Sequence, residues 1–342
     1  MLGGGRGPAV PRDGGGRARY RRGVTRLVLL HGRDSGDVDP DDVERRWLAA
    51  LAAGLDAVGS DVRPTDDDAT FVHYGAMLDA FTGGTPTPPV TTHAERADGY
   101  LPLLAGLDAA GARFVLAVAR EVLAGVGGDV PAAPVTPAAG GVVGDALAVA
   151  LASALAAIDR WVPGLSGAVV LVLARDVHTY LHDPDARAAV EAGVLAALPD
   201  DEPAVVVAHS LGAVVAFQVL RSRAAVGRDV PLLVTLGAPL AIAAVRDAVA
   251  AVAPLAWPAP VDRWVAVRDP RDLLAPQDLT PETFPLDPPG PGIENVHVRN
   301  TALLRHAAAT VRDDRPAGYA ATPEVAELLL AAGVFPPSTP AG

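Results

Sequence analysis

The sequence predicts an α/β protein built on a doubly wound, mostly parallel sheet. Short apolar runs, which suit buried parallel strands, alternate with segments of helical periodicity. This alternation is typical of βαβ units, in which each crossover helix packs back onto the sheet. The 342 residues are enough for one large domain, and half of them are hydrophobic, so we expect a sizeable core.

The first of these units is expected near the N-terminus. Residues 26–30 are a short apolar segment that suits a buried strand. Asp39 and Pro40 are typical of an N-cap and a first helical residue, and apolar residues follow them at helical spacing. Residues 70–74 are rich in aromatic and β-branched residues, which favours a second strand.

Strand patterns return at a steady spacing in the second half of the chain. They lie at 203–208, 231–236, 262–268 and 293–298, with helical patterns between the first three. Asp183 and Pro184 predict the start of the helix that precedes them. Between the two halves, residues 99–182 read as mostly helical, although 168–174 fits a helix or a strand.

These patterns define the expected domain organisation. Residues 1–23 are rich in Gly and Arg and lack periodicity, which predicts a disordered tail. Residues 24–342 are expected to form a single domain, in which the segment at about 99–182 is a helical insertion over one end of the sheet. An apolar insertion in this place suggests a lid or cap.

Composition excludes several classes of function. The net charge of −12 gives the chain no electrostatic attraction to nucleic acid or to anionic lipid. The absence of Cys excludes disulfides, thiolate metal sites and cysteine nucleophiles. We expect no secretory signal, because no apolar h-region follows the N-terminal Arg residues. We also expect no stable membrane insertion, because no apolar run reaches the roughly 18 residues that a span requires. A cytoplasmic protein is the resulting expectation.

The motif that carries chemistry is Ala208-His209-Ser210-Leu211-Gly212. It stands between an apolar strand pattern and a helical one, which predicts a sharp strand-to-helix turn. Such a turn exposes the Ser210 hydroxyl and leaves room only for small residues two positions before and after it. The N-terminus of the following helix offers N–H groups to a developing oxyanion. Ser210 is therefore the candidate nucleophile.

A second serine fits a looser form of the same pattern. Ser166 lies between Gly164 and Ala168, so small residues again stand two positions before and after it. The residues before Ser166 do not form a strand pattern, and Ser210 has the full context on both sides. A helix N-cap is the alternative role for Ser210 itself.

A catalytic serine needs a histidine base and an orienting carboxylate. Asp272 lies just after a strand pattern and precedes two apolar residues, so it is favoured over Asp269 as the acid. His306 is favoured as the base because it lies on a loop beyond the last strand pattern, and we expect it to open an Ala-rich helix. His297 stands inside that strand pattern, where its ring would face one side of the sheet.

These motifs together resemble the lipase and esterase branch of the α/β-hydrolase superfamily. The resemblance spans about residues 25–310 and is carried by four features of the sequence. They are His31-Gly32-Arg33 after the first strand, the Ala208–Gly212 turn, a strand ending in Thr235-Leu236-Gly237-Ala238-Pro239, and the later Asp and His. The segment from Arg175 to Pro184 also resembles uncharacterised bacterial hydrolases of this branch.

The resemblance implies a serine hydrolase that cleaves a small-molecule or lipid ester through an acyl-enzyme on Ser210, without a cofactor or metal. It also implies an oxyanion hole formed by the N–H of Leu211 and that of Arg33 or Gly32. The substrate pocket is expected to include His31, His209, Gly237 and Ala238.

Other interpretations remain open at this point. His178 and His182 are four residues apart and would share a helix face, but no third ligand is evident, so we predict no metal site. A hydrolase-like module that binds a lipid or a protein without catalysis is the alternative function. The same three residues could also act on a thioester or an amide, because the sequence does not identify the substrate.

Overall fold

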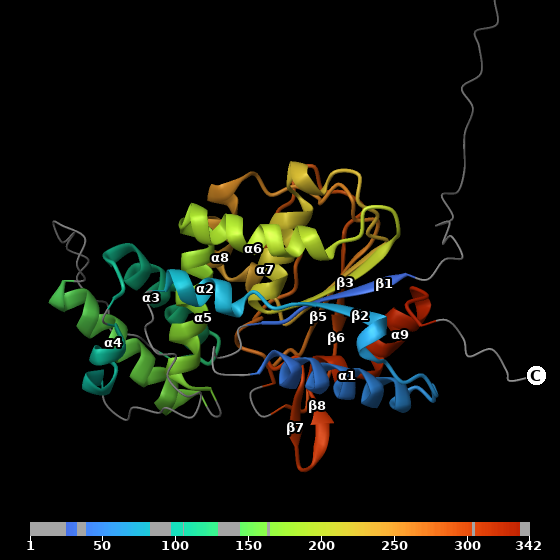
Figure 1. Cartoon of the computed structure of the whole chain (residues 1–342). Coiled ribbons are helices and arrows are strands. Elements are labelled where there is room, and N and C mark those ends of the chain that lie inside the picture. The colour runs from blue at the N-terminus through green and yellow to red at the C-terminus, as the bar shows by residue number, and fades with distance from the viewer. Residues whose placement is uncertain are drawn as a thin grey trace, which may run out of the picture.

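The structure is a computed structural model that describes residues 25–32, 39–82, 97–104, 106–128, 144–162, 165–302 and 305–335. Within these residues, a six-stranded sheet has the order β2-β1-β3-β4-β5-β6, and every pair of neighbouring strands is parallel (Figure 1). The strands are β1 (Arg26–Leu30), β2 (Ala69–Val72), β3 (Ala204–His209), β4 (Leu232–Leu236), β5 (Trp264–Arg268) and β6 (Ile293–His297). The predicted α/β class and the parallel sheet are confirmed.

The central strands are apolar throughout because both faces of the sheet are covered. In β3, Val206 faces one buried cluster and Val205 faces the other, as the alternation of a strand requires. Helices α6 (Pro184–Ala197), α7 (Leu211–Leu220) and α8 (Ala243–Val252) pack on one face. Helices α1 (Pro40–Ala57) and α9 (Pro323–Ala331) pack on the other (Figure 1).

Two helix starts follow from local chemistry, as the sequence predicts. The Asp39 side chain accepts a hydrogen bond from the N–H of Asp41 at the start of α1. The Asp183 side chain accepts from the N–H groups of Asp185 and Ala186 at the start of α6. Each cap satisfies N–H groups that have no partner within the helix.

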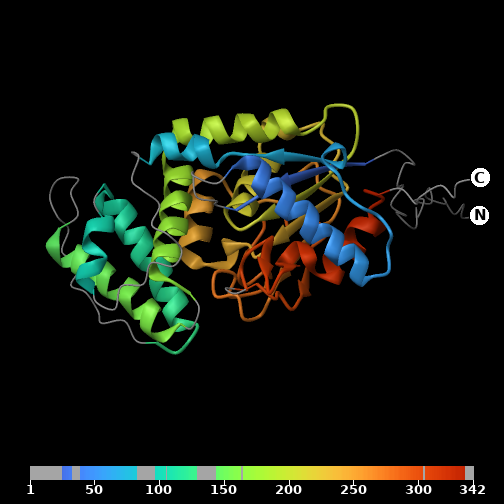
Figure 2. The same cartoon turned by 60° about the horizontal axis from the view of Figure 1, so that its bottom comes forward.

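The described part of the predicted insertion is helical. It contains α3 (Ala109–Ala124), α4 (Asp145–Trp161) and α5 (Gly167–His182), and α2 (Gly75–Phe81) leads to it from β2. These helices gather beyond one end of the sheet (Figures 1 and 2). The ambiguous residues 168–174 are therefore helical, because they belong to α5. Short 3₁₀ helices lie at Asp66–Asp68, Ala97–Gly99, Leu101–Leu104, Arg223–Ala225, Pro239–Ala241 and Tyr319–Ala321, the last being η6.

The prediction of an Ala-rich helix that begins at His306 is wrong. The chain instead forms an antiparallel pair, β7 (Thr310–Arg312) and β8 (Arg315–Ala317), joined by a turn with positive φ at Asp313 and Asp314. The carbonyl groups of residues 307 and 308 accept hydrogen bonds from the N–H groups of residues 319 and 320. Tertiary pairing thus takes the acceptors that a helix would have needed.

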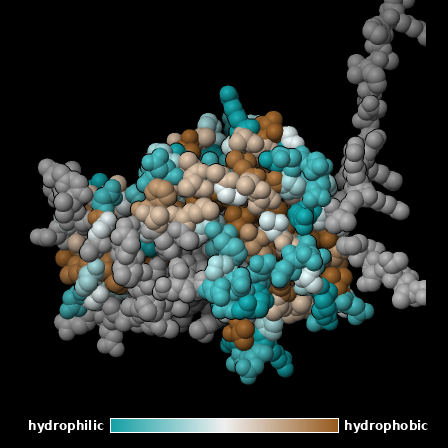
Figure 3. Space-filling model, viewed as in Figure 1, coloured by the Kyte–Doolittle hydropathy of each residue, from teal (hydrophilic) through white to brown (hydrophobic). Residues whose placement is uncertain are grey.

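Residues 1–23, predicted to be a disordered tail, lie outside the part of the chain that the structure describes. Among the helices that it does describe, none has the length and apolar character required to cross a membrane. Hydrophilic and hydrophobic side chains are mixed on the face seen in Figure 3.

Candidate active site

The candidate site lies at the carboxyl ends of β1 and β3, where the strand order of the sheet reverses. From β1 the chain goes to β2 on one side and later to β3 on the other. Connections that leave in opposite directions open a crevice at the carboxyl ends of the two strands, where α/β proteins bind ligands. His31 and Gly32 follow β1, and Ser210 follows β3. A Cβ added to Gly32 would lie 3.1 Å from the Ser210 Cβ, so the two segments are in contact.

Ser210 occupies the turn between β3 and α7 with φ 53° and ψ −121°. A positive φ is strained for a residue other than glycine and persists only where the surrounding structure enforces it. Gly212 allows the turn to close, because a Cβ there would lie 2.6 Å from the carbonyl oxygen of His31. Helix α7 begins at Leu211, and the first N–H groups of a helix lack partners within it.

Three of the predicted residues form a hydrogen-bonded relay. The Ser210 Oγ lies 2.9 Å from His306 Nε2, and His306 Nδ1 lies 2.8 Å from Asp272 Oδ2. With the proton on Nδ1, the imidazole donates to the carboxylate and accepts from the serine hydroxyl. Ser210 and Asp272 are 2% and 1% exposed, so the relay is shielded from water. Loops that follow β3, β5 and β6 bring the three side chains together.

The Asp272 carboxylate has two further donors. Its Oδ1 accepts from the N–H of Leu274 at 3.0 Å, and its Oδ2 accepts from the Tyr319 hydroxyl at 2.7 Å. Burial, and next the neighbouring Asp272 carboxylate, raises the pKa of Tyr319, so its hydroxyl remains a donor. Tyr319 was not predicted from the sequence, and no motif around it marks this role.

Asp269, the alternative acid, has other partners. Its carboxylate accepts from the Arg271 side chain, from the N–H of Arg271 at 2.9 Å and from the N–H of Asn300 at 2.9 Å. Burial by itself would raise the pKa of Asp269, but these hydrogen bonds outweigh it and hold the pKa below its ordinary value. Asp269 and Asp272 stand at the two ends of one turn, which we call the acid turn. Asp269 therefore connects the acid turn to the loop that carries His306.

The alternative base also lies elsewhere. His297 is the last residue of β6, and its Nε2 lies 2.8 Å from Asp278 Oδ1. Its side chain is 49% exposed. The structure thus places His306 beside Ser210 and engages His297 with a different carboxylate.

Two further histidines support the walls of the site. His209 Nε2 donates to the carbonyl oxygen of His306 at 2.6 Å. Burial, and next the proximity of His306, holds the pKa of His209 well below its ordinary value, so this ring is neutral. The His31 ring stacks on Tyr74, with ring centroids 5.0 Å apart. His209 therefore fixes the His306 loop, and the Tyr74 hydroxyl fixes the His31 backbone through its carbonyl oxygen.

Gly237, at the end of β4, packs against the acid and the base. Its φ is 54°, and a Cβ there would lie 3.0 Å from Asp272 Oδ2 and 3.3 Å from His306 Nδ1. Ala238 follows it and is buried. Arg33, one of the two expected oxyanion donors besides Leu211, lies outside the described residues.

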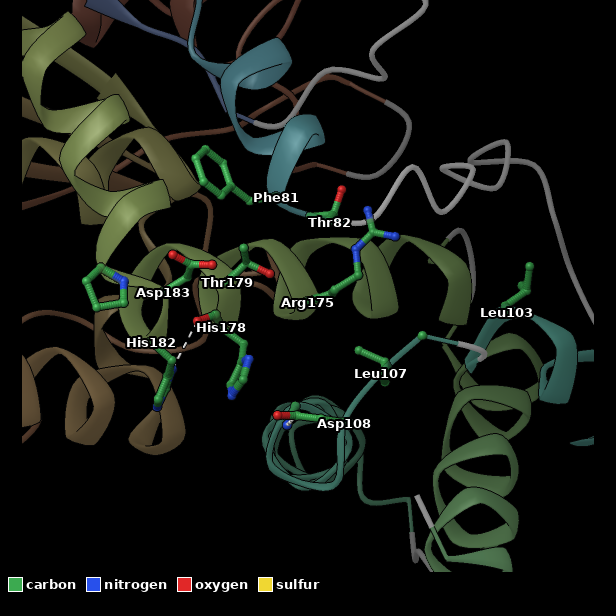
Figure 4. Close-up of a pocket in the computed structure, with 13 residues that line it drawn as sticks. Phe81, Thr82, Leu103, Leu107, Asp108, Arg175, His178, Thr179, His182 and Asp183 are labelled. Atoms are coloured by element: carbon green, nitrogen blue, oxygen red, sulfur yellow. Dashed lines mark hydrogen bonds between the residues drawn. The ribbon is translucent and has the colours of Figure 1, made fainter. Parts of the chain in front are cut away.

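A separate cavity of about 540 Å³ lies between α2, α3 and α5 (Figure 4). Arg175, His178, Thr179 and His182 line it from one face of α5, because residues three and four apart share a helix face. The rings of His178 and His182 stack with centroids 4.1 Å apart. Burial, and next His182, lowers the pKa of His178 to about 4.

The conspicuous segment from Arg175 to Pro184 therefore builds the wall of this cavity. Arg175 points toward Thr82 (Figure 4). Its Nε donates to the buried Asp176 at 3.1 Å. No serine or cysteine is among the described residues that line the cavity. Within the described part of the chain, no three His, Cys, Asp or Glu side chains are grouped so that they could hold a metal ion.

Comparison with protein-family models, with curated proteins and with solved structures finds no match to this chain. The structure itself shows an α/β fold with a parallel sheet and helices on both faces. The assignment of an activity therefore depends on the geometry around Ser210.

Proposed function

We propose that this chain is a serine hydrolase of the α/β-hydrolase kind that cleaves carboxylic esters, with Ser210 as its nucleophile. The observation that carries the proposal is the relay of two hydrogen bonds from Ser210 through His306 to Asp272. Its support comes from the strained turn at Ser210, because strain of this kind concentrates at functional sites.

The reaction follows from the direction of these hydrogen bonds. Ser210 Oγ attacks the ester carbonyl while His306 Nε2 takes its proton, and Asp272 holds the imidazole in the required tautomer. The tetrahedral oxyanion accepts from the N–H of Leu211 at the start of α7 and from a second N–H in the loop after β1, that of Gly32 or Arg33. The alcohol then leaves with the proton from His306.

Water completes the cycle by attacking the acyl-enzyme. His306 takes a proton from this water, and Ser210 regains its own when the acid product leaves. No step of this mechanism calls on a metal or a cofactor.

The topology supports the family assignment as well as the chemistry. The serine, the acid and the histidine occur in that chain order, which is the order of the α/β-hydrolases. They follow β3, β5 and β6 of one parallel sheet, so all three lie at its carboxyl edge. The helices of the insertion gather beyond one end of the sheet, and we assign them the role of a cap over the substrate (Figure 2).

A fluorophosphonate probe tests the nucleophile directly, because it labels activated serines. We expect the full chain to be labelled and Ser210→Ala to lose both labelling and ester hydrolysis. Ser166→Ala is the matched control, since Ser166 is also buried and its Oγ accepts from the N–H of Ala168 as a helix cap. Equal labelling of Ser210→Ala and the wild type would refute the assignment. A labelled chain that cleaves only thioesters or amides would keep the nucleophile and change the substrate class.

A further inference from the structure

Tyr319 links the two aspartates of the acid turn. Its hydroxyl accepts a hydrogen bond from the N–H of Asp269 at 3.0 Å and donates one to Asp272 Oδ2 at 2.7 Å. Oδ2 is also the atom that accepts from His306 Nδ1. Tyr319 and His306 therefore share one carboxylate oxygen.

Burial, a backbone hydrogen bond and a ring contact hold Tyr319 in position. Its side chain is fully buried, and its own N–H donates to the carbonyl oxygen of Ala307, next to His306. Its ring lies against Gly237, where an added Cβ would come within 2.8 Å of the Tyr319 Cε2. The hydroxyl has little freedom to turn away from Asp272.

The sharing of Oδ2 has a consequence for the base. A carboxylate that accepts several donors has its charge partly compensated, so it attracts each donor less strongly. If the tyrosine hydroxyl is removed, His306 becomes the one side-chain donor to Oδ2 among the described residues, and the attraction between the carboxylate and a protonated His306 increases.

The other groups around His306 do not compensate for this change. His209, whose ring centroid lies 4.9 Å away, is neutral, and Ser210 carries no charge in the ground state. The charge of the Asp269 carboxylate is already engaged by Arg271 and by the N–H of Asn300. Asp272 is therefore the charged group through which Tyr319 acts on His306.

We propose that Tyr319 is a positioning residue that orients the Asp272 carboxylate and, by sharing its Oδ2, sets how strongly His306 holds a proton. It acts through Asp272 and does not touch the substrate. The inference deepens the proposed function and rests on it only for the kinetic part of its test.

The test compares three groups at position 319 in the full chain. Tyr319→Phe keeps the ring and removes the hydroxyl, and replacement by 3-fluorotyrosine keeps a hydroxyl that is a stronger donor. Proton NMR of the His306 ring across a pH titration gives the midpoint of its protonation. We expect the midpoint to move to higher pH in Tyr319→Phe and to lower pH in the fluorotyrosine protein, each relative to the wild type. The acid limb of kcat/KM for ester hydrolysis should move in the same directions.

Tyr100→Phe is the matched control. Tyr100 is also fully buried, and its hydroxyl donates to a carboxylate, Asp159 Oδ2, at 2.6 Å within the insertion. It should lose a similar amount of thermal stability while the His306 midpoint stays where it is in the wild type.

Two results would overturn the inference. One is an unchanged His306 midpoint in a folded Tyr319→Phe protein, which would reduce Tyr319 to a packing residue. The other is an equal shift in Tyr100→Phe, which would show a general effect of stability. Because the NMR titration needs no substrate, it decides the inference even if the chain hydrolyses no ester, and the fluorotyrosine protein decides it if Tyr319→Phe does not fold.

Discussion

Two regions of this molecule gather histidines beside carboxylates, and only one of them forms a relay. Around Ser210, each nitrogen of His306 has a different side-chain partner, a hydroxyl at 2.9 Å and a carboxylate at 2.8 Å. In the cavity on α5, His182 Nδ1 lies 3.0 Å from the backbone oxygen of His178, and the two rings stack. Similar residue types therefore produce different arrangements.

The difference comes from how each cluster is assembled. The cavity residues share a face of α5 because of helical spacing alone, which brings neighbours together without aligning their polar atoms. The Ser210 cluster draws on loops after three strands, and each loop is held by its own hydrogen bonds. Alignment of donors and acceptors, more than the presence of histidine, distinguishes a candidate active site.

Histidine variants test the contrast between the Ser210 cluster and the cavity on α5, and we expect them to show the largest effect. His306→Ala should lower ester hydrolysis by about five to six orders of magnitude, close to the loss in Ser210→Ala, because members of a triad act as a unit. The double variant should lose no more than either single one. His178→Ala should keep most of the activity. Steady-state kinetics on a chromogenic ester measure all four proteins, and a comparable loss in His178→Ala would assign the cavity to the reaction.

The two aspartates of the acid turn should separate catalysis from stability. Asp272→Asn should lower turnover by about three to four orders of magnitude, since the asparagine favours the wrong imidazole tautomer. Asp269→Asn should lower turnover far less, because Asp269 binds Arg271 and the backbone of Asn300.

Asp269→Asn should instead reduce the free energy of unfolding. The pKa of Asp269 lies below its ordinary value, so its contribution to stability is present above the ordinary carboxyl range and is lost as pH falls through the folded-state pKa. Urea denaturation at neutral and at acid pH measures the difference between wild type and variant, which should shrink at acid pH. The opposite ranking of the two variants in turnover would make Asp269 the acid.

A methyl group added beside the relay should have an intermediate effect. Gly237→Ala places a Cβ 2.8 Å from Tyr319 Cε2 and 3.0 Å from Asp272 Oδ2. The methyl group must displace the tyrosine ring, the carboxylate or the backbone, and we expect kcat to fall by about tenfold or more. Gly227→Ala is the control, because Gly227 also has a positive φ but an added Cβ would meet nothing within 4 Å. Equal losses of activity in the two variants would mean that backbone strain, and not crowding of the relay, is responsible.

The smallest expected effect concerns the pH dependence of stability. The pKa of His178 is lowered to about 4, so between about pH 4 and the ordinary imidazole value near 6.5 the unfolded chain binds the proton that the folded chain does not. Stability attributable to His178 is therefore present above this range and lost as pH falls through it. His178→Gln should make the free energy of unfolding less dependent on pH there, by up to about one proton. Chemical denaturation at several pH values measures this dependence. If the free energy of unfolding depends on pH equally in His178→Gln and the wild type, the lowered pKa of His178 is contradicted.

Elements whose signals are local could be predicted from the residues alone. Apolar runs predict β1 and β3, because strands covered on both faces need no polar residues. Asp39 and Asp183 predict the starts of α1 and α6, since a cap needs only a side chain and its own backbone. The small residues around Ser210 predict the turn, because a Cβ at Gly212 would collide with the carbonyl of His31.

Other features depend on partners far along the chain, so they are set only when the chain folds. Arg271 and Asn300 form hydrogen bonds with the Asp269 carboxylate, so Asp272 is the aspartate that contacts His306. The segment after His306 is not helical because its carbonyl groups pair with residues 319 and 320. Tyr319 reaches Asp272 across 47 residues, a contact that no spacing in the sequence encodes. Local chemistry specifies turns and caps, whereas the choice among similar side chains is made by the hydrogen bonds that the folded chain leaves available.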